Sequence, residues 1–242
     1  MKTLVIQSCC SEDIPVWIEQ CLASVKSWCK HQGHAWRFID DEIFELVPDW
    51  YIEKTGKGPV ATDYARLVGI HKILKNEDFE QVIWLDADVY ILDKSMVLEC
   101  RKSCAFGHEV WVQKDGNGFK ARKNVHNAVC LFKPCCVVLP FLIETVASII
   151  QRADIEKIAP QMVGPKLLSA LHSLYDFDML PQVGAISPEV ALDIRSGEGP
   201  ALRLLLEKTG GALQAVNLCA SLITDDEALA VIAGIKLLQR GA

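Results

Sequence analysis

Gln81-Val82-Ile83-Trp84-Leu85-Asp86-Ala87-Asp88-Val89 is the stretch of this sequence that decides the expected fold. Residues 82–85 form a short apolar run with the β-branched and aromatic side chains typical of a strand buried on both faces. Because side chains alternate along a strand, Asp86 and Asp88 are expected to point the same way. In an open α/β sheet, ligands bind at the carboxyl ends of strands, which is where this pair would lie.

Two neighbouring carboxylates repel each other unless a cation or hydrogen-bond donors offset their charge. Hard oxygen ligands suit Mg²⁺ or Mn²⁺, so the sequence predicts a divalent-metal site at Asp86 and Asp88. An Asp-x-Asp triplet is short and also occurs by chance in solvated turns. The position of this triplet directly after a buried strand favours the metal site.

Composition limits the class of protein. The chain has 242 residues, half of them hydrophobic, which is enough for one large α/β domain. The formal net charge of −6 provides no broad basic field, so we expect no nucleic-acid partner. No run of about 18 apolar residues could form a transmembrane segment, and the N-terminus lacks the apolar core of a secretory signal. With ten cysteines and no paired Cys-x-x-Cys spacing, we expect a reduced, cytoplasmic protein.

The chain before the motif has a βαβ pattern. Residues 3–6 are expected to form a strand, apolar residues between 17 and 28 have helical spacing, and Gly33 would end that helix. Residues 36–39 are expected to form a second strand. This order favours a parallel sheet. Residues 40–60 predict a short helix followed by a loop.

A second helix is expected to begin with Thr62 as its cap and to carry Asp63 and Arg66. Residues three apart are neighbours on a helix surface, so this pair could be an ordinary ion pair or part of a site. After the motif, strands are expected at 110–114 and 128–132 around the turn Asp115-Gly116-Asn117-Gly118. The same interval contains four basic residues, which could form a solvated loop or attract a diphosphate or an acidic acceptor: Lys114, Lys120, Arg122 and Lys123.

The C-terminal half predicts further helices and short strands. Helices are expected at 140–150, after the Gly164-Pro165 turn, and at 202–206. Residues 179–186 are expected to hold a short strand, and 215–218 a strand end or a helix turn. Thr224 and Glu227 form a capping-box pattern at the start of a final, core-packing helix. Peripheral membrane association through that helix stays open.

Several of these segments together resemble nucleotide-sugar glycosyltransferases of the GT-A fold, especially retaining bacterial enzymes with Asp-x-Asp motifs and the glycogenin-like and capsular-sugar groups. The resemblance spans residues 3–217. Its most specific part is Asp63-Tyr64-Ala65-Arg66 followed by Leu85-Asp86-Ala87-Asp88. His126-Asn127-Ala128-Val129 and Val163-Gly164-Pro165 resemble two further segments of these enzymes.

The resemblance implies an α/β, GT-A-like single domain with a mostly parallel central sheet flanked by helices. Residues 1–95 would form a Rossmann-like nucleotide-sugar-binding half, 96–223 the acceptor half, and 224–242 a packing helix. Asp86 and Asp88 would hold Mn²⁺ or Mg²⁺ and the donor, with Arg66 as a further catalytic residue. The remaining donor-binding residues would be Gln7, Ser8, Asp63, Asn127 and Gly164. Asn217 lies where many of these enzymes carry a metal-binding histidine, so it is the expected third metal ligand.

The function implied is metal-dependent transfer of a hexose from a nucleoside diphosphate sugar, expected to be a UDP-sugar, to a hydroxyl of a glycan or small acceptor, with retention. Two alternatives stay open. A non-catalytic GT-A-like nucleotide-binding or scaffold protein would explain Asn217. A phosphohydrolase would use Asp86 as nucleophile and Asp88 as general acid, although such enzymes begin with the acidic strand and 80 residues precede Gln81 here. The sequence leaves the sugar, the acceptor and the oligomeric state open.

Overall fold

The computed structural model describes residues 1–211 and 213–240 of the chain. The strands are β1 (Thr3–Ser8), β2 (Ala35–Ile39), β3 (Gln81–Leu85), β4 (Val89–Ile91), β5 (Cys104–Asp115), β6 (Gly118–Phe132), β7 (Asp178–Leu180), β8 (Val183–Ala185) and β9 (Ala215–Asn217). The α-helices are α1 (Val16–Gln32), α2 (Asp49–Thr55), α3 (Pro59–Asn76), α4 (Val138–Arg152), α5 (Pro165–His172), α6 (Pro188–Ser196), α7 (Pro200–Thr209) and α8 (Asp225–Arg240). Short 3₁₀ helices are η1 (Asp41–Leu46), η2 (Ile155–Lys157) and η3 (Ala220–Leu222).

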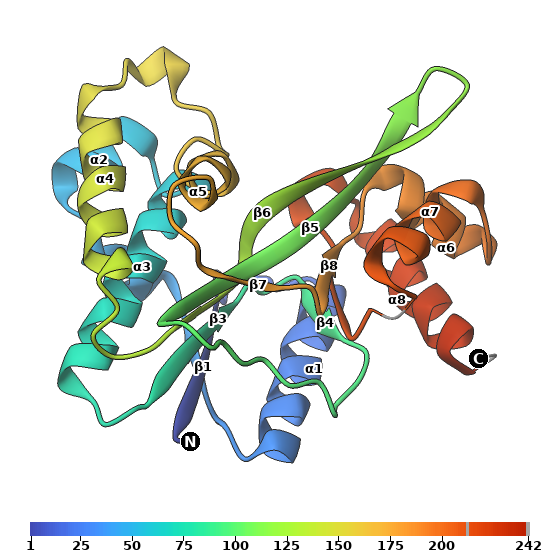
Figure 1. Cartoon of the computed structure of the whole chain (residues 1–242), viewed down its shortest axis with the longest axis horizontal. Coiled ribbons are helices and arrows are strands. Elements are labelled where there is room, and N and C mark those ends of the chain that lie inside the picture. The colour runs from blue at the N-terminus through green and yellow to red at the C-terminus, as the bar shows by residue number, and fades with distance from the viewer. Residues whose placement is uncertain (212, 241–242) are drawn as a thin grey trace.

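Six strands form the central sheet in the order β2-β1-β3-β6-β5-β7. The pairs β1–β2, β1–β3 and β5–β7 are parallel, whereas β3–β6 and β5–β6 are antiparallel. Helices cover the sheet on both sides, with α2, α3 and α4 together on one side and α1 on the other (Figure 1). The predicted α/β class, with a mostly parallel sheet flanked by helices, is confirmed.

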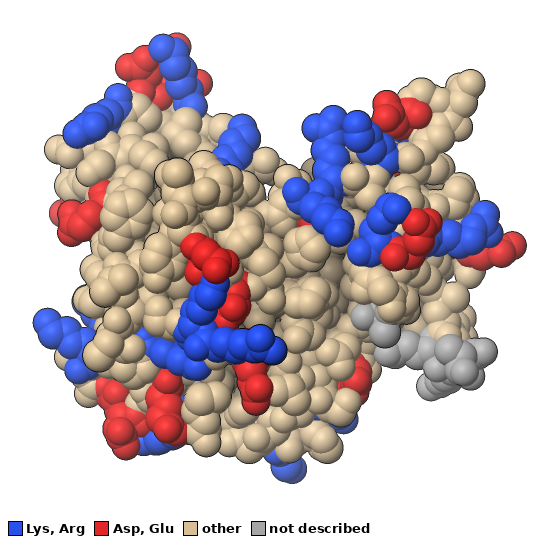
Figure 2. All heavy atoms as spheres, in the orientation of Figure 1, with Lys and Arg blue, Asp and Glu red and all other residues tan. Residues whose placement is uncertain are grey.

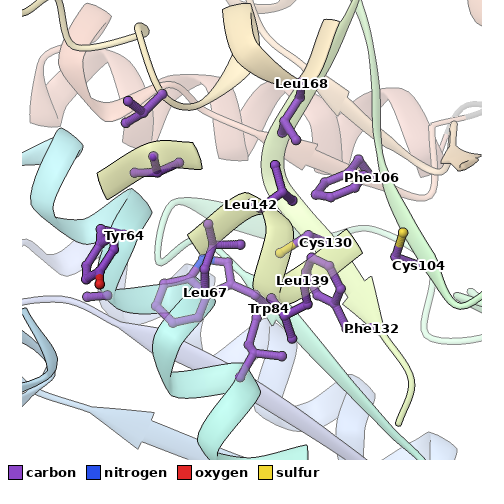
Figure 3. Packing of buried hydrophobic residues seen from close by; sticks show 14 of the residues in the cluster. Tyr64, Leu67, Trp84, Cys104, Phe106, Cys130, Phe132, Leu139, Leu142 and Leu168 are labelled. Carbon is purple, nitrogen blue, oxygen red and sulfur yellow. The ribbon is translucent and has the colours of Figure 1, made fainter. Parts of the chain in front are cut away.

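Strands β1 and β3 are buried on both faces because their alternating side chains enter two different cores. Leu4 and Trp84 pack with α3 and α4, while Val5 and Ile83 pack with α1. Side chains from α3, α4, β3 and β6 converge in the first of these cores, as Figure 3 shows around Trp84. This double burial explains why the run before Asp86 is continuously apolar.

The N-terminal βαβ unit forms as its sequence predicts. Helix α1 ends where Gly33 takes a left-handed conformation at φ 71°, which a residue without a Cβ adopts at little cost. The predicted cap of the next helix is wrong: α3 begins at Pro59 with Gly58 as its N-cap. Thr62 lies inside the first turn instead, where its hydroxyl donates to the Gly58 carbonyl. Proline is favoured at the first position of a helix, and this preference decides the boundary.

The strands of the predicted hairpin are much longer than expected. Strands β5 and β6 pair as far as Asp115 and Gly118, so the turn lies where it was predicted and its loop is Gly116 and Asn117. The basic residues after the turn therefore belong to a strand and not to a loop. The consecutive polar residues Arg122, Lys123 and Asn124 interrupt the apolar–polar alternation of β6. Val110 and Val112 of β5 are buried against α7 and its neighbours.

The small sheet joins two distant parts of the chain. Strand β4 follows Asp88 directly and pairs with β9, so that Val89 lies opposite Asn217. The 215–218 segment is thus a strand end, one of the two predicted alternatives. Helix α8 begins with the predicted capping box, in which the Thr224 backbone N–H donates to the Glu227 carboxylate, and it buries Val231, Ile232 and Ile235.

All ten cysteines are free thiols, and six of them are buried: Cys21, Cys29, Cys100, Cys104, Cys130 and Cys136. Among the described residues, no helix is both long and apolar enough to cross a membrane.

The His126 ring of β6 packs against the β5 backbone at Gly107. A Cβ at Gly107 would lie 2.1 Å from His126 Nε2, so only glycine leaves room for the ring. The ring is buried, and Nε2 lies 3.2 Å from the Val183 carbonyl oxygen. Burial lowers the pKa of His126 to about 4.

The lowered pKa of His126 predicts a loss of stability in acid. The unfolded chain would take up a proton at the usual pKa of 6.5, while the folded ring stays neutral down to about pH 4. The free energy of unfolding should therefore fall as the pH drops through this window, by up to about 3 kcal/mol from this residue.

His126→Gln retains a donor for the Val183 carbonyl and removes the titration. We expect the difference in unfolding free energy between wild type and variant to change with pH between 6.5 and 4, measured by urea unfolding. A difference that is independent of pH would contradict the assignment. Buried carboxylic acids with raised pKa values change the unfolding free energy with pH in the opposite direction. They are present in both proteins, so the difference between wild type and variant isolates the contribution of His126.

Candidate functional site

A cleft of about 1030 Å³ opens where strands β1 and β3 end. Ser8 lines it from the end of β1, and Asp86 and Asp88 line it directly after β3. Asp63 and Arg66 reach it from α3, and Asn127 reaches it from β6. The structure thus brings together in one cleft most of the side chains that the sequence marked as site residues.

The Asp86 carboxylate is held by two donors on the same oxygen. The Trp84 indole Nε1 donates to Oδ1 at 2.6 Å, and Arg66 Nη1 lies 3.2 Å from that oxygen. The Asp86 backbone N–H also donates to the Ala128 carbonyl, continuing the pairing of β3 with β6. Within the described residues, Oδ2 of Asp86 accepts no hydrogen bond. One carboxylate oxygen is therefore free to serve as a ligand in the cleft.

Arg66 is the central cation of the site. Its side chain is only 6% exposed, and Nη2 lies 3.1 Å from Asp63 Oδ1. Nη1 also donates to the Asn127 carbonyl, and the guanidinium carbon lies 5.0 Å from the centre of the Trp84 ring. The guanidinium thus bridges Asp63 and Asp86. The spacing of Asp63 and Arg66 allowed an exposed ion pair, but the structure buries both partners.

Asp63 of α3 and Asn127 of β6 form a second polar contact in the site. Asn127 Nδ2 donates to Asp63 Oδ1 at 2.7 Å. A Cβ at Gly164 would lie 2.6 Å from Asp63 Oδ2 and 2.9 Å from Asn127 Nδ2. The absence of a side chain at Gly164 therefore makes room for this pair, which is a more specific reason for glycine than entry into α5. Gly164 itself does not line the cleft.

The Asp88 carboxylate is fixed by the C-terminal segment. Asn217 Nδ2 donates to Oδ1 at 2.6 Å, and the Ala220 backbone N–H donates to Oδ2 at 2.8 Å. The amide oxygen of Asn217 accepts instead from the Cys219 backbone N–H at 3.1 Å. Asn217 thus presents its amino group to Asp88, and the oxygen that would bind a metal points to Cys219. Its role as a metal ligand stays a prediction, and it requires the side-chain amide to flip so that the oxygen faces Asp88.

Burial and the nearby charge of Asp86 raise the pKa values of Asp63 and Asp88. Burial raises the pKa of Asp63 to about 6 even though Arg66 lies beside it. Burial and the nearby charge of Asp86 raise the pKa of Asp88 as well. Burial would lower the pKa of Arg66, but Asp86 and Asp63 raise it, so the guanidinium stays charged. The site contains three carboxylates around one arginine and has room for more positive charge.

Gln7 and Ser8 have different positions. Gln7 is fully buried, its Nε2 donates to the Asp86 carbonyl at 3.2 Å, and its Oε1 accepts from the Trp36 indole. Gln7 therefore holds the backbone of the acidic motif through the Asp86 carbonyl and does not line the cleft. Ser8 does line the cleft.

Several residues of the cleft were not singled out in the sequence. Lys57 and Lys166 line the cleft, and so do Cys10, Asp41 and Ser221. Lys166 directly follows the Gly164-Pro165 turn, which was a signal for its position, while Lys57 belongs to a segment that read only as a loop. Among the described residues, one group of three metal-binding side chains has its ligand atoms close together: Cys10, Asp40 and Asp41 at the edge of the cleft. These side chains are largely exposed, and acidic groups of this kind are common without a metal.

The donors around Asp86 and Asp88 fit a hard divalent cation. The free Oδ2 of Asp86 and the remaining lone pairs of Asp88 are oxygen ligands of the type that Mg²⁺ and Mn²⁺ prefer. Both carboxylates point into the same open cleft, and their shared excess of negative charge is what a cation would neutralise. The residues present are therefore compatible with a metal bound in the cleft at Asp86 and Asp88.

The sequence matches no family profile and no curated protein sequence. Solved structures are similar in fold. A glycosyltransferase involved in the glycosylation of the major capsid of PBCV-1 is 10% identical with a TM-score of 0.56, and the match covers 99% of this chain and 100% of that one. Mouse xyloside xylosyltransferase 1 has a TM-score of 0.48 at 10% identity, covering 92% and 99% of the two chains. The galactosyltransferase LgtC has a TM-score of 0.42 at 13% identity, covering 98% and 95%. The match to the PBCV-1 glycosyltransferase, with a TM-score above 0.5 over both chains, shows that this chain has the GT-A fold that the resemblance predicted.

The Arg66 network generates a prediction about stability. Arg66→Gln would leave Asp63 and Asp86 without their shared cation, and breaking a buried pair of this kind costs about 3–5 kcal/mol. We expect a lower free energy of unfolding for the single variant, measured by urea unfolding at pH 7. Adding Asp63→Asn removes the unpaired buried charge, so the double variant should be more stable than Arg66→Gln alone. If the second substitution destabilised the protein further, the ion pair would not be what Arg66 supplies.

Proposed function

We propose that this GT-A-fold chain is a metal-dependent glycosyltransferase that moves a hexose from a nucleoside diphosphate sugar to a hydroxyl group. The observation that carries the proposal is the pair Asp86 and Asp88 at the end of β3, held by neighbouring donors in a cleft of about 1030 Å³. The similar PBCV-1 glycosyltransferase supports it through the shared fold. A UDP-sugar as the donor and retention of anomeric configuration follow from the resemblance of the sequence motifs.

In this proposal, Asp86 and Asp88 hold Mn²⁺ or Mg²⁺ together with the diphosphate of the donor. When bound, the divalent cation supplies positive charge that stabilises the nucleoside diphosphate as a leaving group. The bond between the anomeric carbon and the phosphate oxygen breaks, and the acceptor oxygen forms a bond to that carbon and loses its proton. The products are the glycosylated acceptor, the nucleoside diphosphate and a proton.

The chain's own residues orient the donor. Arg66 lines the cleft and holds Asp86 in place, so its fixed charge lies beside the leaving group. Asn127 lines the cleft beside Asp63 and could face the transferred sugar. Lys57 and Lys166 are two further cations of the cleft that could contact the phosphates. Ser8 lies at the end of β1, where a nucleotide in an open α/β sheet would bind.

A non-catalytic nucleotide-binding protein is the second candidate. It is favoured by one observation, since Asn217 donates its amide hydrogen to Asp88 and offers no oxygen there. Such a protein would bind a nucleoside diphosphate sugar without releasing the sugar. Turnover of the donor therefore separates the two candidates.

The donor site can be tested by calorimetric titration of the protein with UDP and with GDP, with and without Mn²⁺. We expect UDP to bind only with the metal, and Asp88→Asn to weaken this binding by at least about tenfold, because loss of even an outer-shell partner of a metal costs about 10–100-fold and Asp88 is the proposed direct ligand. Asp78→Asn removes the same charge from a fully exposed side chain before β3, at the end of the strand opposite the cleft, and should bind like wild type. The donor-site proposal fails if neither nucleotide binds with metal, or if the two variants behave alike.

The stereochemical outcome can be measured without knowing the acceptor. With a panel of UDP-α-hexoses and Mn²⁺, slow transfer to water should release the hexose first as its α-anomer, followed in time by proton NMR. A β-anomer released first would show inversion and remove retention from the proposal. UDP-sugar binding without any release would favour the non-catalytic candidate.

A further inference from the structure

The hairpin of β5 and β6 has an exposed face that the reaction at Asp86 and Asp88 does not use. The hairpin extends beyond the rest of the central sheet, toward the upper right of Figure 1. Val110 and Val112 are fully buried on one face of β5, against the core that includes α6, α7 and α8. Because strand side chains alternate, Trp111 and Gln113 lie on the opposite face.

The strand pairing places cations next to these two residues. Trp111 lies directly opposite Arg122, and Gln113 lies directly opposite Lys120. Directly opposed residues of an antiparallel pair are close enough for their side chains to touch one ligand together. Trp111 and Gln113 are half-buried, whereas Lys120 and Arg122 are exposed. We refer to these four residues as the hairpin face.

The two cations of the hairpin face are not used within the fold. Neither Lys120 nor Arg122 forms an ion pair with any side chain in 1–211 or 213–238. The whole hairpin carries four Lys and Arg against two Asp and Glu, in a chain whose net charge is −6. Figure 2 shows several Lys and Arg side chains at the upper right, in the region of the hairpin and its neighbouring helices, with fewer Asp and Glu side chains among them. This local positive charge attracts an anionic partner.

We propose that the hairpin face binds an anionic glycan, the carboxylate-bearing part of the acceptor, while its terminal hydroxyl lies in the cleft. This inference rests on the proposed glycosyl transfer and names the class of acceptor. The Arg122 guanidinium fits a sugar carboxylate with two parallel hydrogen bonds, and the Lys120 ammonium adds a second positive charge. The Trp111 indole offers a flat apolar surface for the apolar face of a sugar ring, and the Gln113 amide can bond to its hydroxyls.

The position of the hairpin face supports a glycan that reaches the cleft. Strand β6 carries both Arg122 and Asn127, and Asn127 lines the cleft. The two residues are five apart, which is at most about 17 Å along the strand, because the register with β5 shifts between His126 and Cys130. A chain of several sugar residues can span this distance. The few charges of the hairpin face, interleaved with an indole and an amide, suit such a glycan better than the dense charge of a nucleic acid.

The test is calorimetric titration with α-1,4-linked tetragalacturonate at low ionic strength, with maltotetraose as the neutral probe of equal length. Wild type should bind the anionic probe more tightly than the neutral one. Lys120→Gln/Arg122→Gln should weaken binding of tetragalacturonate by at least about tenfold, because two charge-assisted contacts are lost. Lys72→Gln/Lys75→Gln removes the same charge from α3, far from the hairpin, and should leave the affinity unchanged.

Three results would overturn the proposal. The first is no detectable binding of tetragalacturonate by wild type, and the second is an equal loss of tetragalacturonate affinity in both double variants. The third is that wild type binds phosphatidylglycerol vesicles through Lys120 and Arg122 but does not bind the glycan. The last would identify a membrane as the partner. UDP binding with Mn²⁺ is measured on the same variants and should be unchanged. If UDP fails to bind wild type while tetragalacturonate binds through the hairpin face, the donor site is wrong and the hairpin face stands.

Discussion

The buried guanidinium of Arg66 is the contact on which the arrangement of the cleft depends. It lies between Asp63 and Asp86, two carboxylates from different elements that would repel each other without it. Its charge also holds the carbonyl of Asn127, so helix α3, the end of β3 and strand β6 meet at one cation. Removing a charge from such a buried cluster is costly, whereas keeping it fixes the orientation of the Asp86 carboxylate before any ligand arrives.

The hydrogen bonds around the acidic motif divide its two carboxylates between different tasks. Asp86 lines the cleft and uses only Oδ1 for its contacts with Trp84 and Arg66, so Oδ2 accepts no hydrogen bond from the described residues. Asp88 is tied on both oxygens to the segment around Asn217 and Ala220, which the small sheet carries across from the C-terminal part of the chain. The motif therefore connects the end of β3 in the six-stranded sheet with β9 in the three-stranded sheet. A cation bound at Asp86 and Asp88 would strengthen this connection. The orientation of Asn217 is the feature that most directly affects how tightly that cation could bind.

The proposed donor site and the hairpin face belong to one continuous strand. Strand β6 pairs with β3 beside the acidic motif, contributes Asn127 to the cleft, and then continues outward with β5 to present Lys120 and Arg122. A rigid paired strand positions side chains more precisely than a loop does. The same element can therefore set the distance between a reacting sugar and a more remote part of its acceptor.

The sequence by itself determined the elements whose signals are local. The apolar run before Asp86, the two-residue turn at Asp115 to Gly118 and the capping box at Thr224 each depend on neighbouring residues, and each appears in the structure where it was expected. The sequence also marked Asp63, Arg66, Asn127 and Gly164 as a group through a resemblance, but it could not show that Arg66 is buried or that Gly164 makes room for Asp63 and Asn127. Only the tertiary structure decided the length of β5 and β6, the burial of Gln7 behind the motif, and the pairing of Asp88 with Asn217. These features depend on contacts between residues far apart in the chain, which alternation and spacing along a single segment do not encode.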